Sequence, residues 1–259
     1  MKFYPGFDLK VDLEQMAFGY GEGVFGPVVE NRKLEDIRHS LRNPNCEGPE
    51  IVYTIAMDVG RLSDRKDLVE RNLLYGAVLY AKGRLGEEPI RSQGHIHALS
   101  GSCGMSTPEV YEIWSGEAYI YMQESAQDAP GRCFAVLGKP GDVIVVPPGW
   151  AHATISADAE KPLAFGAWCV RDFGFDYKDV RAHKGLAYYP LCQEDGTLNW
   201  VKNTAYLDSE LVIKTPRAYA ELEIKSGMSI YDQYLENPER FMYVVNPRLR
   251  KEIWEKFIP

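Results

Sequence analysis

The chain has few of the residues that build disulfide frameworks or polyanion-binding surfaces. Its 259 residues include five cysteines, an odd number without any Cys-x-x-Cys pair, and 29 Lys and Arg against 37 Asp and Glu. Scattered cysteines in odd number indicate free thiols in a reducing compartment. The net charge of −8 argues against nucleic acid or an anionic membrane as a partner, because both are bound by basic surfaces.

Long apolar runs are missing as well. No stretch approaches the ~20 apolar residues that span a bilayer, and the first residues hold no apolar segment of the kind found in signal peptides. We therefore expect a cytoplasmic protein with no membrane contact. The sequence also shows no internal repeat and no low-complexity segment, so nothing in it indicates a repeat architecture.

From about residue 50 to 190 the sequence is a series of short apolar segments separated by turn residues. Strands are expected at residues 51–57, 73–80, 89–97, 110–123, 132–137, 142–146, 153–155 and 163–170. Such spacing is typical of an antiparallel sandwich or a small barrel. An aromatic content of 12%, with sixteen tyrosines, also favours β structure.

The two ends have a different composition. Residues 1–30 are rich in Gly, Phe and Pro, which suits an arm lying over a core better than a regular element. A short amphipathic helix is expected at residues 34–41, where apolar residues recur at helical spacing. Two strands are expected within residues 197–213, and the helical spacing of residues 230–235 and 248–257 is interrupted by prolines.

These features predict an all-β fold, a β-sandwich or small barrel, with an N-terminal arm and additional C-terminal helices. Residues 1–49 would form the arm and a short helix packed on the core. Residues 50–190 would form the barrel, and residues 191–259 a C-terminal extension of strands followed by helices.

Histidine is scarce, and three of the five histidines fall in two short motifs. His95 and His97 are one residue apart, so on a strand both side chains point to the same face, as two imidazole ligands of one metal ion would. His152 ends a segment that fits the pattern Gly-x5-Pro-x-Gly-x2-His. A carboxylate from the strand between the motifs would complete a site of three histidines and one glutamate, and both Glu109 and Glu112 lie there.

The two motifs resemble those of the cupin superfamily. Its second motif is Gly-x5-Pro-x-Gly-x2-His-x3-Asn, which this chain matches except at the last position, where Ser156 replaces Asn. In the first motif, His-x-His is followed by a Glu, six residues and a Gly. Glu109 and Gly116 have this spacing, so the resemblance selects Glu109 and keeps Glu112 as the alternative. Eleven residues, 98–108, precede Glu109 where three or four are usual, and we expect them to form a longer hairpin loop.

Within this superfamily the chain is similar to the cupin-type glucose-6-phosphate isomerases. Those enzymes carry a Thr/Ser-x-Gly-His-x-His-Ala segment, a Glu-Val-Tyr strand and a Pro-Pro-x-Trp-Ala-His segment, which correspond here to residues 92–98, 109–111 and 147–152. The resemblance covers the expected barrel. It departs at Cys169 and Phe175, which stand where the family has a Tyr and a His in the substrate pocket.

The resemblance implies a cupin barrel of the jelly-roll type that interconverts glucose 6-phosphate and fructose 6-phosphate, in glycolysis and gluconeogenesis. It implies one divalent metal ion per chain, which by ligand type is Fe²⁺, Mn²⁺, Ni²⁺ or Zn²⁺. Four side chains would hold the ion: His95, His97, Glu109 and His152. A homodimer is expected, because cupins commonly pair.

The resemblance also implies roles for the residues around the metal. Glu109 and Tyr111 are the expected catalytic residues, with Glu109 as metal ligand, proton-transferring base or both in turn. Ser92, Gly94 and Tyr111 are the expected substrate-binding residues, the first two at the phosphate. Three cations are candidates to assist at the phosphate: Arg91, Lys161 and Arg171.

Two other functions stay open on the sequence alone. A mononuclear Fe²⁺ or Cu²⁺ dioxygenase of the cupin type would use the same ligand set, and oxygen uptake would reveal it. The other is a metal-bearing cupin without catalytic activity that binds sugar or has a structural role, since a fold does not by itself determine a function.

Overall fold

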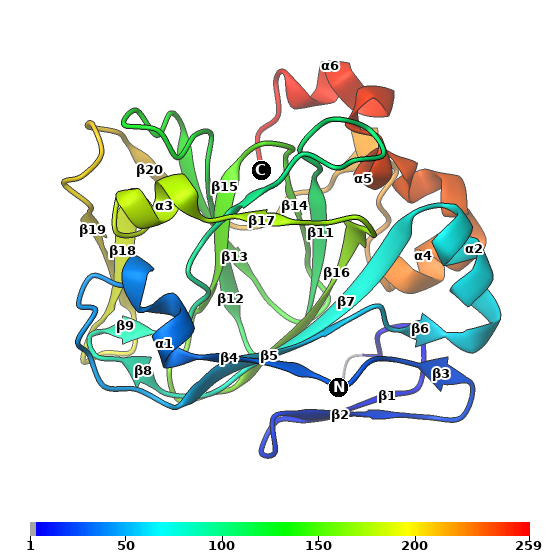
Figure 1. Cartoon of the computed structure of the whole chain (residues 1–259), viewed down its shortest axis with the longest axis horizontal. Helices are drawn as coiled ribbons and strands as arrows, with labels where there is room; N and C mark the ends of the chain where they lie inside the picture. The colour runs from blue at the N-terminus through cyan, green and yellow to red at the C-terminus, as the bar shows by residue number, and fades with distance from the viewer. Residues whose placement is uncertain (1–3) are drawn as a thin grey trace.

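Two facing β-sheets form the centre of the computed structural model, which describes residues 4–259 (Figure 1). The larger sheet has six strands in the order β14-β11-β16-β7-β5-β4, and the smaller has four in the order β15-β12-β13-β20. The larger sheet contains β4 (Glu30–Lys33), β5 (Ile51–Met57), β7 (Leu73–Tyr80), β11 (Glu109–Ser115), β14 (Val143–Val146) and β16 (Leu163–Val170). The smaller contains β12 (Ala118–Gln123), β13 (Cys133–Gly138), β15 (Ala151–Ser156) and β20 (Leu211–Lys214). The prediction of an all-β fold is confirmed.

Within residues 4–259, five strand pairs and several short helices surround the two sheets. The pairs are β1 (Leu9–Asp12) with β2 (Ala17–Tyr20), β3 (Val24–Phe25) with β6 (Gly60–Arg61), β8 (Arg84–Leu85) with β9 (Glu88–Pro89), β10 (Ile96–His97) with β17 (Phe175–Asp176), and β18 (Tyr188–Cys192) with β19 (Leu198–Lys202). The α-helices are α1 (Leu34–Ile37), α2 (Arg65–Glu70), α3 (Lys178–Ala182), α4 (Ile230–Glu236), α5 (Met242–Val245) and α6 (Lys251–Trp254). Short 3₁₀ turns are η1 (Arg38–Ser40), η2 (Leu62–Asp64), η3 (Ala220–Leu222), η4 (Pro238–Phe241) and η5 (Pro247–Arg250). None of the described helices has the length and apolar character that a membrane crossing needs.

The space between the sheets is filled by residues that alternate along the strands. Side chains two apart point to the same face, so Ile113, Ile120 and Val136 meet in the interior, where all three are fully buried. Gly116 closes the turn from β11 to β12 with a φ of +74°, and a Cβ there would lie 2.7 Å from the carbonyl oxygen of Pro162. The glycine of the first motif is therefore needed to join the two sheets at this turn.

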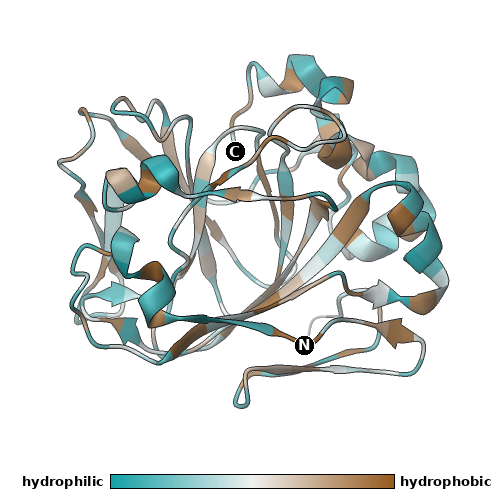
Figure 2. Cartoon of the chain, viewed as in Figure 1, coloured by the Kyte–Doolittle hydropathy of each residue, from teal (hydrophilic) through white to brown (hydrophobic). Residues whose placement is uncertain are grey.

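Helices of the C-terminal extension cover the outer face of the larger sheet, at the right of Figure 1. β16 is buried along its whole length, because one face looks into the barrel and the other lies under these helices. Trp168 anchors the contact: its ring stacks on Tyr231 with centroids 5.4 Å apart, and its Nε1–H donates to the carbonyl oxygen of Ile230 at 3.2 Å. Figure 2 shows apolar colour along the central strands and mixed colour on the helices outside them, as such layering requires. The prediction of C-terminal helices is confirmed.

Both ends of the chain also contribute strands. β4 pairs with β5 at the edge of the larger sheet, and β20 pairs in parallel with β13 at the edge of the smaller one. The prediction that residues 1–30 lack regular elements is wrong, because the β1–β2 hairpin and β3 form there. A signal for the hairpin is Asp12, whose carboxylate accepts the backbone N–H groups of Glu14 and Gln15 at 3.1 and 2.9 Å and so stabilises the turn.

The strand expected at residues 89–97 is broken in the middle. Only its ends, β9 and β10, are regular strands, while Arg91 and His95 make single bridges to Ile155 and His152 of β15. Gly94 interrupts the strand with a φ of +86°. The backbone therefore turns between Ser92 and His95, so Ser92 and Gly94 do not lie on one face of a regular strand.

Candidate metal centre and substrate pocket

Three histidines and one glutamate converge at one end of the barrel interior. The side chains belong to His95, His97, Glu109 and His152, and one ligand atom of each lies within 4.8 Å of all the others. The bridge from His95 to His152 joins the two sequence motifs, with backbone hydrogen bonds of 3.1 and 2.9 Å in both directions. Glu109 begins β11, which lies in the facing sheet. The cluster thus depends on the two sheets closing against each other.

Backbone carbonyls orient two of the imidazoles. His97 Nδ1 lies 2.8 Å from the carbonyl oxygen of Thr107, and His152 Nδ1 lies 3.0 Å from that of Trp150. A carbonyl oxygen can only accept, so in both rings Nδ1 carries the hydrogen and Nε2 presents a lone pair to the cluster. This arrangement of an outer hydrogen bond behind an inward-facing nitrogen is typical of metal-binding histidines.

Two of the inward-facing nitrogens have no hydrogen-bond partner. The buried Nε2 atoms of His95 and His97 have no hydrogen-bond partner, and those of His97 and His152 each lie 3.2 Å from Glu109 Oε2. Lone pairs and a carboxylate oxygen gathered in a buried space repel one another unless a cation lies between them. A divalent ion with nitrogen and oxygen ligands fits this donor set.

The charge states of the cluster agree with this donor set. Burial, followed by the neighbouring His152 and His97, holds the pKa of His95 well below its usual value, so the ring is neutral. Burial alone would raise the pKa of Glu109, but hydrogen bonds and positive charge from His152 and His97, when these rings carry a second proton, outweigh burial and hold the pKa well below its usual value. A metal cation between the rings would act in the same direction. Neutral imidazole and ionised carboxylate are the forms that bind metals.

Each oxygen of Glu109 has a further partner. The Tyr111 hydroxyl donates to Oε2 at 2.7 Å, because residues two apart on β11 share a face. The Cys169 thiol, on the adjacent strand β16, donates to Oε1 at 3.3 Å. Burial, and then the Glu109 charge, raise the pKa of both donors well above their usual values, so both keep their protons. The family resemblance leads us to expect a tyrosine at position 169. Here the Cys169 thiol occupies that position and donates a hydrogen bond to the Glu109 carboxylate.

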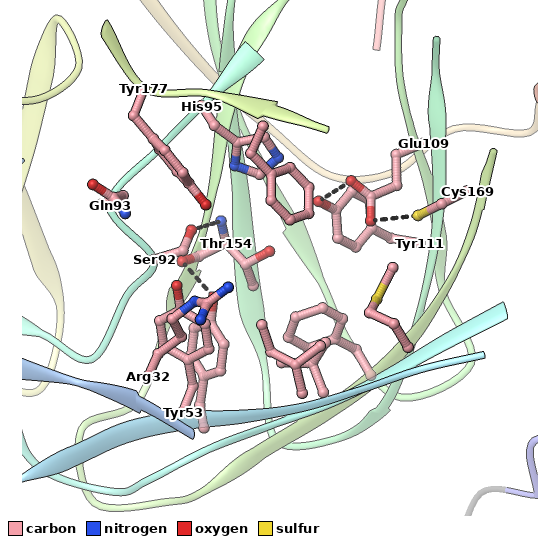
Figure 3. Close-up of a pocket in the computed structure, with 16 residues that line it drawn as sticks. Arg32, Tyr53, Ser92, Gln93, His95, Glu109, Tyr111, Thr154, Cys169 and Tyr177 are labelled. Atoms are coloured by element: carbon pink, nitrogen blue, oxygen red, sulfur yellow. Dashed lines mark hydrogen bonds between the residues drawn. The ribbon is translucent and has the colours of Figure 1, made fainter. Parts of the chain in front are cut away.

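A pocket extends from the cluster into the barrel (Figure 3). His95, Glu109 and Tyr111 line one end, and apolar residues that include Val78 and Phe165 line the floor. Polar side chains from several strands line the other end: Arg32, Tyr53, Ser92, Gln93, Thr154 and Tyr177. The pocket therefore offers a metal-binding end and a hydrogen-bonding end to one elongated ligand.

Sequence reasoning missed most of the polar end. Ser92 lies there as expected, and its Oγ accepts the backbone N–H of Thr154 at 3.2 Å. Gly94 does not line the pocket, and its missing side chain is explained by packing, since a Cβ would lie 2.9 Å from Leu186. Arg32 belongs to a polar strand outside the resemblance. For Tyr177, the sequence offers one signal, the similarity of Asp176-Tyr177 to the same segment of the family.

The three cations suggested for the phosphate lie elsewhere. Arg91 is buried and pairs with Glu88 at 2.6 Å, while Arg171 pairs with Asp58 at 2.8 Å. Lys161 pairs with an exposed aspartate at the surface. None of the three lines the pocket, so these suggestions are wrong. Proximity to a motif in the sequence does not predict phosphate binding here, because each of these basic side chains pairs with a carboxylate outside the pocket.

The segment 98–108 folds into a loop against the metal-binding end. Asp172 holds the loop, because its carboxylate accepts the Ser102 N–H at 2.8 Å and the Ser100 hydroxyl at 2.9 Å. At its far end, Ser106 Oγ accepts the N–H of Gly149, in the second motif, at 3.0 Å. The loop also supplies the carbonyl that orients His97. The additional residues are therefore part of the support of the cluster.

Glu112, the alternative ligand, points away from the cluster. It lies on the outer face of β11 and accepts the backbone N–H of Ile230, at the start of α4, at 2.8 Å. Its second oxygen accepts the Trp114 indole N–H at 3.2 Å and the Tyr75 hydroxyl at 3.4 Å. The period of two along the strand separates the two glutamates, one inside the barrel and one beneath the helices.

Comparison with known proteins identifies the family of the chain. The family described as "Glucose-6-phosphate isomerase (GPI)" matches residues 39–208. A glucose-6-phosphate isomerase of Thermococcus litoralis is 25% identical over 198 residues, which cover 72% of this chain and 90% of that protein. The protein of the same name from Thermococcus onnurineus is 31% identical over 210 residues, which cover 78% of this chain and 97% of that protein.

Among solved structures, that of an oxalate oxidase matches with a TM-score of 0.37 and 13% identity, over 50% of this chain and 56% of that one. The family assignment rests instead on the sequence matches, which span more than half of the chain and nearly the full length of the curated relatives named above. The chain belongs to the cupin-type glucose-6-phosphate isomerase family.

Proposed function

We propose that this protein is a metal-dependent aldose–ketose isomerase that interconverts glucose 6-phosphate and fructose 6-phosphate. The observation that carries the proposal is the cluster of three imidazoles and one carboxylate at one end of a pocket whose other end is polar. Membership of the isomerase family supports the reaction. The reaction would serve glycolysis or gluconeogenesis. We also propose that the protein is a homodimer, and light scattering would measure its mass in solution.

His95, His97, Glu109 and His152 would hold one divalent ion, because their ligand atoms gather in one place and the Nε2 atoms of His95 and His97 have no hydrogen-bond partner. Fe²⁺, Mn²⁺, Ni²⁺ and Zn²⁺ all suit imidazole and carboxylate ligands. When bound, such an ion polarises the oxygens on carbons 1 and 2 of the sugar and stabilises negative charge on them.

The side chains of the pocket perform the rest of the reaction. We propose that the Glu109 carboxylate accepts a proton from one of the two carbons and returns it to the other, as a base in a buried, water-poor site can. Tyr111 donates to the same carboxylate at 2.7 Å and keeps it oriented. Ser92, at the polar end, offers its hydroxyl to the phosphate. Glu109 has one oxygen facing the imidazoles and one facing Cys169, so ligand and base roles are compatible.

A coupled assay of fructose 6-phosphate isomerisation on purified protein tests the proposal. Chelation should abolish turnover, and a divalent ion should restore it in proportion to the metal bound. His95→Gln should lose both metal and turnover, whereas His183→Gln, at an imidazole outside the cluster that contacts Asp128, should retain both. Undiminished activity in a verified metal-free sample would remove the metal from the proposal, and oxygen uptake without isomerisation would favour the dioxygenase instead.

A further inference from the structure

A ladder of three side chains crosses the polar end of the pocket. Arg32 on β4 is the register partner of Tyr53 on β5, which is in turn the partner of Tyr80 on β7. Register partners in neighbouring strands point to the same face, and all three side chains line the pocket. Figure 3 shows the Arg32 guanidinium close to Ser92 and away from Glu109. A fixed positive charge therefore stands at the end opposite the metal site.

The Arg32 guanidinium is mostly buried, and its ion pair uses one of its nitrogens. The Arg32 side chain is 22% exposed, and its carboxylate partner, Glu30, is 60% exposed. Only Nη1 takes part in that ion pair, so the remaining N–H groups of the fork are free to meet an acceptor. An ion pair with a largely exposed partner contributes little to stability. The pair by itself gives a weak reason for an arginine inside a pocket.

A surface groove leads to the same side chain. Arg32, Gln93 and Tyr177 line both the inner pocket and this groove, which Arg181 also lines. Arg181 donates its Nε–H to the Gln93 amide oxygen at 2.9 Å and lies over the Tyr177 ring at 4.8 Å. Two guanidinium groups thus flank the polar entrance of a protein whose net charge is −8. Glu35 and Asp36 line the same groove, so its formal charges balance. The positive charge that an anionic ligand can meet is the Arg32 guanidinium itself, which lines both the groove and the inner pocket.

We infer that Arg32, supplied by the N-terminal arm, binds the phosphate of the sugar phosphate and sets the preference of the pocket for phosphorylated sugars. The inference rests on the proposed function. A guanidinium presents several N–H donors in a plane that matches the oxygens of a phosphate. Arg32 and the Ser92 hydroxyl would hold the phosphate end, while the reacting carbons lie at Glu109. β4 lies before residues 39–208, the segment that the family model matches.

Calorimetric binding to the metal-loaded protein tests the inference without turnover. The probes are sorbitol 6-phosphate and sorbitol, which lack the carbonyl that isomerisation needs. We expect Arg32→Met to weaken sorbitol 6-phosphate binding about 10- to 100-fold, as loss of a charge-assisted hydrogen bond does, with little change for sorbitol. KM for fructose 6-phosphate should rise similarly, with a smaller effect on kcat. Arg32→Lys should recover part of the affinity, because it keeps the charge without the planar fork.

Glu30→Gln is the matched control, since it removes the ion pair and leaves the guanidinium. It should bind sorbitol 6-phosphate as tightly as the wild type or more tightly. If Glu30→Gln and Arg32→Met lose the same amount of sorbitol 6-phosphate affinity, the ion pair maintains the shape of the pocket and the guanidinium does not bind the phosphate. That result would overturn the inference. So would wild-type affinity in a folded Arg32→Met protein, or a wild type that does not distinguish the two probes. Phosphate-selective, Arg32-dependent binding without isomerisation would uphold the phosphate site and reject the proposed reaction.

Discussion

At the scale of single residues, the chemistry of the site depends on the different neighbours of the two carboxylate oxygens of Glu109. Glu109 Oε2 faces the imidazoles and Tyr111, and Oε1 faces the Cys169 thiol. Both hydroxyl and thiol donors keep their protons, because burial and the adjacent charge raise their pKa values. The carboxylate is therefore held in place from outside the metal cluster, which leaves it positioned for proton transfer.

Glu109→Gln replaces this carboxylate with a neutral group of nearly the same shape. We expect kcat for isomerisation to fall about 10²- to 10⁴-fold, the range that a general base contributes. Metal content measured on the same sample separates the two roles of the residue. Loss of metal would identify a ligand, and lost turnover with retained metal would identify a base. A folded variant with full turnover would exclude Glu109 from catalysis.

At the scale of elements, the loop of residues 98–108 connects the surface to the metal cluster. Asp172 accepts hydrogen bonds from the loop and also from the Asn72 amide at 3.0 Å. From the C-terminal extension, Arg248 donates to the carbonyl oxygen of Cys103 at 2.7 Å. Since the loop carries the carbonyl that orients His97, disorder in the loop should reach the cluster.

Asp172→Ala should therefore weaken metal binding without removing a ligand. Loss of an outer partner of a metal-binding histidine commonly lowers affinity 10- to 100-fold, and we expect about 10-fold here because the carbonyl itself remains. Competition with a chromogenic chelator measures the change. Asp158→Ala is the control, because Asp158 holds a surface turn with Lys161. Equal metal affinity in Asp172→Ala and the wild type would show that the loop is not needed to orient His97.

The elements also show what the sequence could predict. Residues 51–57, 73–80 and 163–170 were assigned as strands with the bounds that the structure has, because each is an apolar run ended by turn residues. The prediction of one continuous strand over residues 89–97 is wrong, because the positive φ of Gly94 and the single bridge at His95 depend on partners distant in sequence. Four ligands were found because they lie in spaced motifs. Arg32 was missed because a strand of sequence Glu-Asn-Arg-Lys does not indicate which face enters a pocket.

At the scale of the whole molecule, the barrel and the C-terminal helices are joined by a buried carboxylate. Glu112 accepts hydrogen bonds from Ile230 at the start of α4 and from Trp114 and Tyr75 beneath the helices. The surrounding layer is aromatic: Tyr75, Trp168 and Tyr231 pack against one another with ring centroids 4.6 to 5.4 Å apart. A charge in such surroundings is poorly solvated, so the attachment of the helices should respond to pH.

Burial outweighs the three hydrogen bonds and raises the pKa of Glu112 from 4.5 to about 8. The folded state therefore binds this proton more tightly than the unfolded chain does. Its contribution to stability is fully present below the unfolded value and is lost as the pH rises through the folded value. Between pH 4.5 and 8, the wild type should lose stability relative to Glu112→Gln by on the order of 4 kcal/mol.

Urea unfolding of the wild type and of Glu112→Gln across this pH range measures the difference. Glu117→Gln, at an exposed glutamate that pairs with Lys139, is the control and should follow the wild type. The amide keeps an oxygen for the Ile230 N–H, so the helices should remain attached and the difference should come from ionisation alone. A difference between the two proteins that does not change with pH would mean that Glu112 stays ionised throughout. In that case the backbone and indole donors stabilise the charge more than burial destabilises it, and the join between barrel and helices is independent of pH.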